Sequence, residues 1–140
     1  ATWHEGIIEL DREVTGLDRR RTLSSILSYP EVSSAVALDS KEDIITAALV
    51  TRSLEGLVTV GPVLGKEMGL LPLIRAIHQT QPSQTTGMSI LISNHSNVVK
   101  SLLDVGFQVN MALGEMTWNN APMPGGARED YLALIHPTLG

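Results

Sequence analysis

The sequence predicts an α+β fold in which a mixed, mostly antiparallel central sheet is flanked by helices. Apolar residues in the first thirty positions have helical spacing. Three short apolar runs joined by polar turns follow, and the remaining chain alternates between helix and strand patterns. A chain of 140 residues has the length of one domain, so we expect a single domain over residues 1–140.

Two helices are expected before residue 30. The first starts near Ile7 and ends at Gly16, and Asp18 can cap the second, whose apolar face contains Leu23, Ile26 and Leu27. Arg19, Arg20 and Arg21 fall in its first turn, where the helix dipole does not favour positive charge. These arginines either form a solvated face, or one of them pairs with Asp11 or Asp18 or reaches a ligand phosphate.

An antiparallel meander is expected next, because short polar turns separate the apolar runs Ala35–Leu38, Ile44–Val50 and Leu57–Val60. We expect Gly61 and Pro62 to stop the third strand, since proline cannot donate a ladder hydrogen bond.

The second half alternates between helix and strand patterns. The first helix is marked by Leu70, Leu73, Ile74 and Ile77, and a mostly buried strand by Met88, Ile90 and Ile92. The second helix carries Val98, Leu102 and Val105 and is closed by Gly106. The last strand should bury one face, made by Phe107, Val109, Met111 and Leu113. A loop over 119–128 and an apolar run over 131–135, helix or strand, complete the chain.

Composition excludes several classes of function. With 15 acidic and 10 basic residues the net charge is −5, which argues against nucleic-acid and anionic-membrane partners. The absence of cysteine excludes disulfides, thiolate catalysis and cysteine-ligated metals, and no metal site is predicted. The N-terminus has no signal-peptide features, so a cytoplasmic location is expected. Because it also lacks a starting Met, we interpret the chain as a processed form or a piece of a longer protein.

One segment has a pattern typical of ligand binding. Residues 60–69 join a strand to a helix through a turn that contains glycines and Lys66. A helix start reached through such a turn offers backbone N–H groups and a positive dipole end to a phosphate. The alternative is an ordinary strand-to-helix turn that holds no ligand.

The order of elements resembles the GNAT acetyltransferase superfamily. The corresponding pieces are the strand Leu57–Val60, the turn Gly65–Gly69, the strand Ile90–Ile92, and Gly106-Phe107 entering a strand. More narrowly, Gly16-Leu17-Asp18-Arg19, Gly61-Pro62, the segment 94–97 and the ending Leu139-Gly140 resemble the C-terminal domain of tandem YitH-like acetyltransferases.

This resemblance implies a domain that transfers acetyl from acetyl-CoA to a small-molecule or peptide amine, with a second GNAT-like domain as a partner. The cofactor would lie in the splay between the family's fourth and fifth strands, which correspond to Leu57–Val60 and Ile90–Ile92, with its pyrophosphate on the backbone of Gly65–Gly69. It would contact Val60, Gly61, Pro62, Val63, Gly65, Lys66, Glu67, Met68, Gly69, Asn94 and Asn97. The nearest general-base candidates are Glu55 and His78.

Two other functions stay open. A non-catalytic GNAT-like module that covers a partner domain or binds a ligand is favoured by Glu67, where the family has a small residue. Leu102 favours it too, because it occupies the position of a frequent tyrosine acid. The remaining alternative is an unrelated α+β binding domain.

Overall fold

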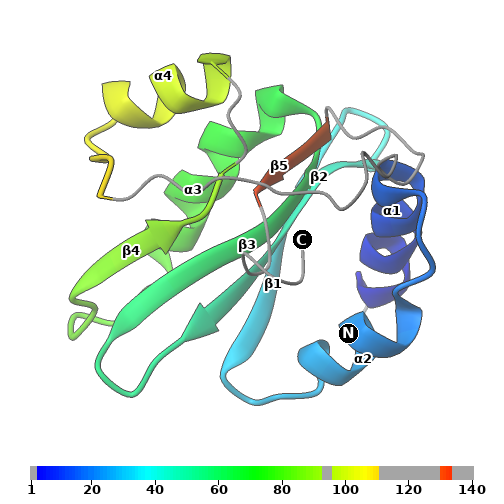
Figure 1. Ribbon diagram of the computed structural model, residues 1–140, viewed down its shortest axis with the longest axis horizontal. Helices are drawn as coiled ribbons and strands as arrows, with labels where there is room; N and C mark the ends of the chain where they lie inside the picture. The colour runs from blue at the N-terminus through cyan, green and yellow to red at the C-terminus, as the bar shows by residue number, and fades with distance from the viewer. Residues whose placement is uncertain (1–2, 93–95, 111–129, 134–140) are drawn as a thin grey trace, which may run out of the picture.

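A computed structural model describes residues 3–92, 96–110 and 130–133. It has the predicted α+β architecture, with a five-stranded sheet and helices packed around it (Figure 1). The elements are α1 His4–Thr15, α2 Arg20–Leu27, β1 Val32–Leu38, β2 Ile44–Arg52, β3 Leu57–Gly65, the 3₁₀ turn η1 Glu67–Gly69, α3 Leu70–Gln79, β4 Gly87–Ile90, α4 Ser96–Asp104 and β5 Tyr131–Ala133. The final apolar run is therefore a strand over 131–133.

The sheet is mixed, as expected. Strands β1, β2 and β3 form the antiparallel meander, and β4 adds to β3 in parallel after the crossover through α3. The parallel ladder runs from Leu57 opposite Gly87 to Val60 opposite Ile90. Beyond it, β5 pairs with β3 in the antiparallel direction.

Strand β3 does not stop at Gly61-Pro62, so that expectation was wrong. The strand continues to Gly65 through a bulge, because Val60 lies opposite Val50 whereas Val63 lies opposite Ala48. The bulged strand has one residue more than its partner here, and a bulge accommodates a residue that cannot donate to the ladder. The peptide bond between Gly61 and Pro62 is cis.

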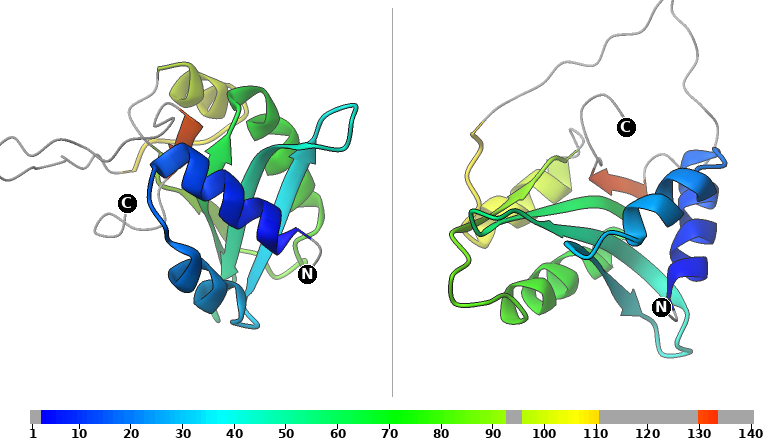
Figure 2. Two further views of the ribbon diagram at one scale, coloured as in Figure 1. Left: turned by 90° about the vertical axis from the view of Figure 1, so that its right-hand side faces the viewer. Right: turned by 90° about the horizontal axis from the view of Figure 1, so that it is seen from below.

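The helices cover opposite faces of the sheet (Figure 2). Alternation along β2 sends Ala48 and Val50 into the core under α3, and Ala47 and Leu49 into the core under α1 and α2. On α3 the buried stripe is the predicted one, Leu70, Leu73, Ile74 and Ile77. Full burial of each such side chain contributes about 1.5 to 3 kcal/mol.

The C-terminal end of α4 is closed by Gly106, as predicted. The N–H of Gly106 donates to the carbonyl of Leu103 (3.1 Å), and the N–H of Phe107 donates to that of Leu102 (3.0 Å). These two bonds form a Schellman motif, in which Gly106 adopts a φ of 103°. Val98 and Leu102 are buried, but Val105 is exposed, so the expected apolar face of this helix ends one turn earlier.

The strand expected from Phe107 to Leu113 is not found in its described part. Residues 107–110 have no regular secondary structure, and the side chain of Val109 is 69% exposed. Phe107 is half-buried against the core under α3. Met111, Leu113 and the loop expected over 119–128 lie outside the described residues.

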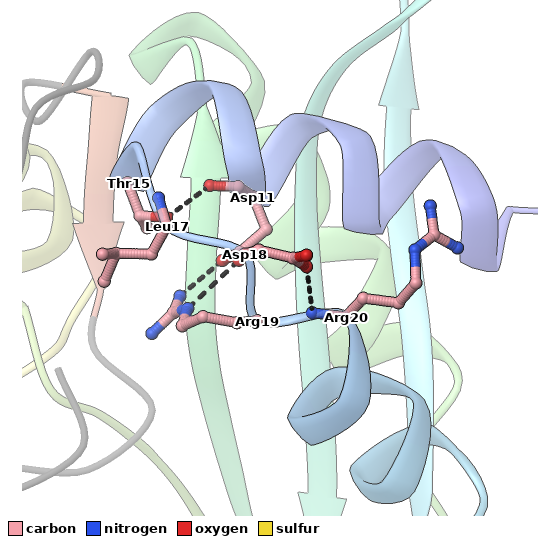
Figure 3. Close-up of polar contacts among 6 residues, drawn as sticks. All are labelled: Asp11, Thr15, Leu17, Asp18, Arg19 and Arg20. Atoms are coloured by element: carbon pink, nitrogen blue, oxygen red, sulfur yellow. Dashed lines mark hydrogen bonds and ion pairs between the residues drawn. The ribbon is translucent and has the colours of Figure 1, made fainter.

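The consecutive arginines have separate roles (Figure 3). Arg19 donates two hydrogen bonds to the carboxylate of Asp11, one of them from Nε to Oδ2 at 3.1 Å, and Asp11 is only 1% exposed. Arg20 pairs instead with the exposed Glu5 at 2.7 Å, and its backbone N–H donates to Asp18 Oδ1 at 3.2 Å. The pairing with Asp11, one of the sequence alternatives, therefore joins α1 to the start of α2.

Candidate functional site

The turn between β3 and α3 packs directly on β2. A Cβ atom on Gly65 would lie 2.2 Å from the carbonyl oxygen of Ile45, and one on Gly69 would lie 2.1 Å from Thr46 Oγ1. Gly65 also has a φ of 107°, which L side chains rarely adopt. The close contact with β2 alone explains why both positions require glycine, without any ligand.

Several backbone N–H groups of the turn are used inside the protein. The N–H of Lys66 donates to Ile45 (2.8 Å), that of Gly69 donates to the carbonyl of Lys66 (3.1 Å), and that of Leu70 donates to Glu67. Thr46 Oγ1 donates to the Lys66 carbonyl at 2.6 Å. These bonds fix the turn and reduce the number of donors that could converge on an anion.

A shallow depression of about 380 Å³ lies beside this turn. The turn and α3 contribute Glu67, Met68, Leu70 and Leu71 to its lining, and α4 contributes Ser101. Lys66 is 63% exposed, and its Nζ lies 2.6 Å from Oδ2 of Asp130, which is 16% exposed. The depression therefore combines an apolar floor with a carboxylate, close to a lysine that is ion-paired.

The edge of β3 that faces away from β2 has two successive partners. Strand β4 occupies it as far as Val60, and β5 occupies it at Val63 and Leu64. Ile92, just beyond β4, bridges to Ala133 of β5. Strand β5 is therefore inserted where β3 and the continuation of β4 separate.

The predicted cofactor residues differ in their exposure to solvent. Val60, Pro62, Val63, Gly65 and Gly69 are buried, whereas Lys66, Met68 and Asn97 are exposed, and Gly61 and Glu67 are intermediate. Residues 60–69 form one continuous stretch of β3 and the turn. Asn97 lies in α4, the helix that also lines the depression. Asn94 lies outside the described residues.

The two general-base candidates lie on different elements, Glu55 in the turn between β2 and β3 and His78 on α3. Glu55 is exposed in the turn between β2 and β3, and it lines a separate depression of about 220 Å³. His78 is exposed in the last turn of α3. Because β3 rises about 3.3 Å per residue from Leu57 to Gly65, Glu55 is roughly 30 Å from the turn.

Thr46 and Asp130 were not among the predicted site residues. Thr46 is fully buried and positions the turn through its hydroxyl. The sequence could have pointed to it, because it is the only polar residue in the run Ile44–Val50. Asp130 had no such signal, because its partner Lys66 is 64 positions away.

The electrostatics of the described residues do not indicate a metal centre. Among them, no group of three or more His, Asp or Glu side chains could hold a metal ion. Hydrogen bonds and opposite charge raise the pKa of Arg20 beside Glu5 and that of Lys100 beside Asp104. Within the same residues, no helix has the length and apolar character needed to cross a membrane.

Comparisons with known proteins agree on the fold. A family model described as "Acetyltransferase (GNAT) domain" matches residues 7–132. No curated protein sequence shows significant similarity to the chain.

The solved structures that resemble this chain include the following three. A protein from Pyrococcus furiosus assigned as an acetyl transferase is 16% identical, with a TM-score of 0.62, 84% of this chain covered and 95% of that one. The aminoglycoside N-acetyltransferase AAC(6')-Iy in complex with CoA is 14% identical, with a TM-score of 0.62. The match covers 84% of this chain and 90% of that one. The aminoglycoside 6'-N-acetyltransferase AAC(6')-Ih from Acinetobacter baumannii is 7% identical, with a TM-score of 0.60. The match covers 86% of this chain and 94% of that one. At these identities the likeness is one of fold.

Proposed function

Because the chain belongs to the GNAT acetyltransferase family, we propose that it is an N-acetyltransferase domain that moves an acetyl group from acetyl-CoA to an amine. The observation that carries the proposal is the separation of β3 and β4. The two strands are parallel as far as Val60 and Ile90, and beyond that point β3 leads into the turn before α3. A separated pair of parallel strands leaves room for an extended segment between their edges, and in the described conformation β5 lies there.

The residues proposed for cofactor binding follow this path. The bulged stretch from Val60 to Val63, with Gly61 and Pro62, would lie along the arm of the cofactor. The turn would receive the pyrophosphate through Gly65, Lys66, Glu67, Met68 and Gly69. The segment near α4, with Asn94 and Asn97, would flank it.

CoA does not fit the described conformation at this place. Strand β5 is hydrogen-bonded to the edge of β3 that the cofactor arm would need, and the N–H groups of Lys66, Gly69 and Leu70 have partners within the chain. Glu67 would also place a carboxylate beside the pyrophosphate. We therefore derive no catalytic step through the cofactor from this arrangement.

A coupled assay tests the proposed activity. Purified protein is incubated with acetyl-CoA and a panel of amines that includes aminoglycosides and lysine-bearing peptides, and the release of thiol is followed. The chain contains no cysteine, so the protein adds no thiol background. Amine-dependent thiol release, with the acetylated product identified by mass, supports the proposal. Absence of release with every amine, despite bound acetyl-CoA, contradicts it.

Two variants test the general-base candidates in the same assay. A fall in kcat for Glu55→Gln or His78→Gln would assign proton removal to that residue. An unchanged kcat in both variants would remove them from the mechanism, and for Glu55 it would agree with its distance from the turn.

A non-catalytic GNAT-like module is the second candidate function. It is favoured by the pairing of β5 with β3 and by Leu102, which is buried in α4 and carries no ionisable group. In this version, the domain would pack against a second GNAT-like domain of a tandem protein. Both candidates are proposed for the cytoplasm, with which a chain without cysteines is compatible.

A further inference from the structure

The side of β1 that faces away from β2 is an open strand edge. Among the described strands β1 ends the sheet, and its partner is β2. The N–H of Arg52 donates to the carbonyl of Glu31 at 3.1 Å, so residues 31, 33 and 35 direct their backbone groups toward β2. Ser34 and Val36 therefore direct theirs away from the sheet, and no described residue bonds to the N–H of either.

This side of β1 has little of the protection that is usual for a strand at the end of a sheet. Such strands are protected by charged side chains, by proline or by a bulge. Over 32–38 the strand contains Val, Ser, Ala and Leu and carries no charge, and its bulge lies at the far end, between Ala37 and Leu38. Residues 32–36 thus form the β1 edge, a regular and uncharged edge that can pair with one more strand.

The charges at both ends of the β1 edge indicate which partner fits it. Glu31 precedes the edge, and the turn after it carries Asp39, Glu42 and Asp43 against a single Lys41, all of them exposed. Opposite charges on neighbouring strands attract, and like charges opposite each other are destabilising. A second copy of this chain, paired antiparallel through the same edge, would bring Glu31 toward the acidic turn of the other copy. The charges therefore disfavour self-pairing and favour a strand with basic ends.

We propose that the β1 edge binds an extended segment of a partner protein, in which uncharged strand-forming residues lie between Lys or Arg residues at both ends. The segment would extend the sheet by one strand, with backbone hydrogen bonds to Ser34 and Val36 and with its basic ends beside Glu31 and the turn over 39–43. This interaction goes beyond the proposed function and does not depend on it, because β2 separates β1 from β3, the strand that leads to the candidate site.

A synthetic peptide tests the proposal. The probe is a capped peptide of sequence KRVTVTVRK, titrated into isotope-labelled protein and followed by nuclear magnetic resonance. The amide signals of Ser34 and Val36 should shift and gain protection from hydrogen exchange, whereas the amides of Ser33 and Ala35, already bonded to β2, should keep the protection they have. A control peptide of sequence EEVTVTVEE should bind about tenfold more weakly or worse. The basic peptide methylated at every central backbone nitrogen should not bind, because it has no donors for the ladder.

Three variants of the protein separate the backbone contribution from the charge contribution. Ser34→Pro removes one outward N–H but none of the bonds to β2, and should weaken the basic peptide about tenfold or more while the circular dichroism spectrum is unchanged. Glu31→Lys reverses the charge at one end and should weaken it about threefold to tenfold. The matched control is Glu13→Lys, which makes the same change of charge at an exposed position of α1 and should alter the affinity by less than about twofold.

Several outcomes would overturn the inference. Unshifted signals of Ser34 and Val36 with the basic peptide would show that the β1 edge does not accept a strand, and equal affinity for the acidic peptide would remove the argument from charge. Dimerisation in sedimentation velocity that Ser34→Pro abolishes would assign the edge to a second copy of this chain. If Ser34→Pro does not fold, the methylated peptide and Glu31→Lys still decide. The assay of thiol release is independent of these results, so the proposed function stands or fails separately.

Discussion

Asp11 is the buried charge that fixes the corner between α1 and α2. Its carboxylate accepts two hydrogen bonds from Arg19, and its backbone carbonyl accepts one from Thr15 Oγ1 at 2.7 Å. Thr15 Oγ1 in turn accepts the N–H of Leu17 at 3.2 Å. Every polar group described here has a partner, which is the condition under which burial of charge is tolerated.

Asp11→Asn should lower the free energy of unfolding by about 3 kcal/mol, because it removes the carboxylate charge that Arg19 faces in a site that is largely closed to water. Urea denaturation measures this loss. Glu5→Gln removes a carboxylate from an exposed arginine pair and should leave the midpoint nearly unchanged. Similar midpoints for the two variants would show that the buried pair does not determine stability.

Substitution of Gly65 and of Gly106 by alanine can separate the cost of a strained backbone from the cost of a steric clash. Their φ values are 107° and 103°, but a Cβ on Gly65 would meet Ile45, whereas one on Gly106 would meet nothing within 4 Å. Gly106→Ala should cost roughly 1 kcal/mol from φ alone, and Gly65→Ala roughly 3 kcal/mol or more. Comparison of their thermal unfolding decides the point, and equal costs would contradict the close packing of the turn on β2.

At the scale of elements, α4 connects to the core through two buried residues and through Phe107, which follows its Schellman motif. Because this ring is half-buried, Phe107→Ala should cost about 2 kcal/mol, below the ~3 to 5 kcal/mol typical of a fully buried aromatic ring. Urea denaturation gives the value. Leu103→Ala, at an exposed position of the same helix, serves as the control. A loss near 5 kcal/mol would mean that the ring is fully enclosed.

The elements that the sequence predicted well are those decided by local pattern. The meander, the stripe of α3 and the glycine end of α4 depend on spacing and on single residues, so they could be predicted. The course of β3 past Pro62 could not, since a bulge depends on the register with β2. The alternation was also a wrong guide over residues 107–110, because a strand needs a partner edge and the described residues provide none for this stretch.

The candidate site divides in the same way. The turn over 65–69 is recognisable from its glycines and its place between a strand and a helix. The pairing of Lys66 with Asp130 and of Leu64 with Tyr131 joins segments that are distant along the chain, and no local pattern encodes it. Glu55 and His78 were chosen as the nearest general-base candidates in the sequence, and nearness along the chain does not give the distance from the turn in space.

At the scale of the whole molecule, one sheet supports two cores. Leu23 of α2 lies in the core on one face, and Leu73 of α3 in the core on the other. Leu23→Ala and Leu73→Ala should each cost about 2 to 5 kcal/mol. Since the sheet separates them, the double variant should lose the sum within about 0.5 kcal/mol. Chemical denaturation of the four proteins measures the coupling, and a larger deviation would show that the two cores communicate through β2.

The separation in sequence between β3 and β5 has a consequence for synthesis. The meander pairs neighbours along the chain, so it can form early, whereas Leu64 and Tyr131 are almost half the chain apart and their loop closes late. A ribosome will have released β3 well before it adds residues 130–133. During that interval the edge of β3 at Val63 and Leu64 lacks the strand that covers it in the finished domain. The nascent chain is therefore open to edge-to-edge aggregation at this point until β5 is made.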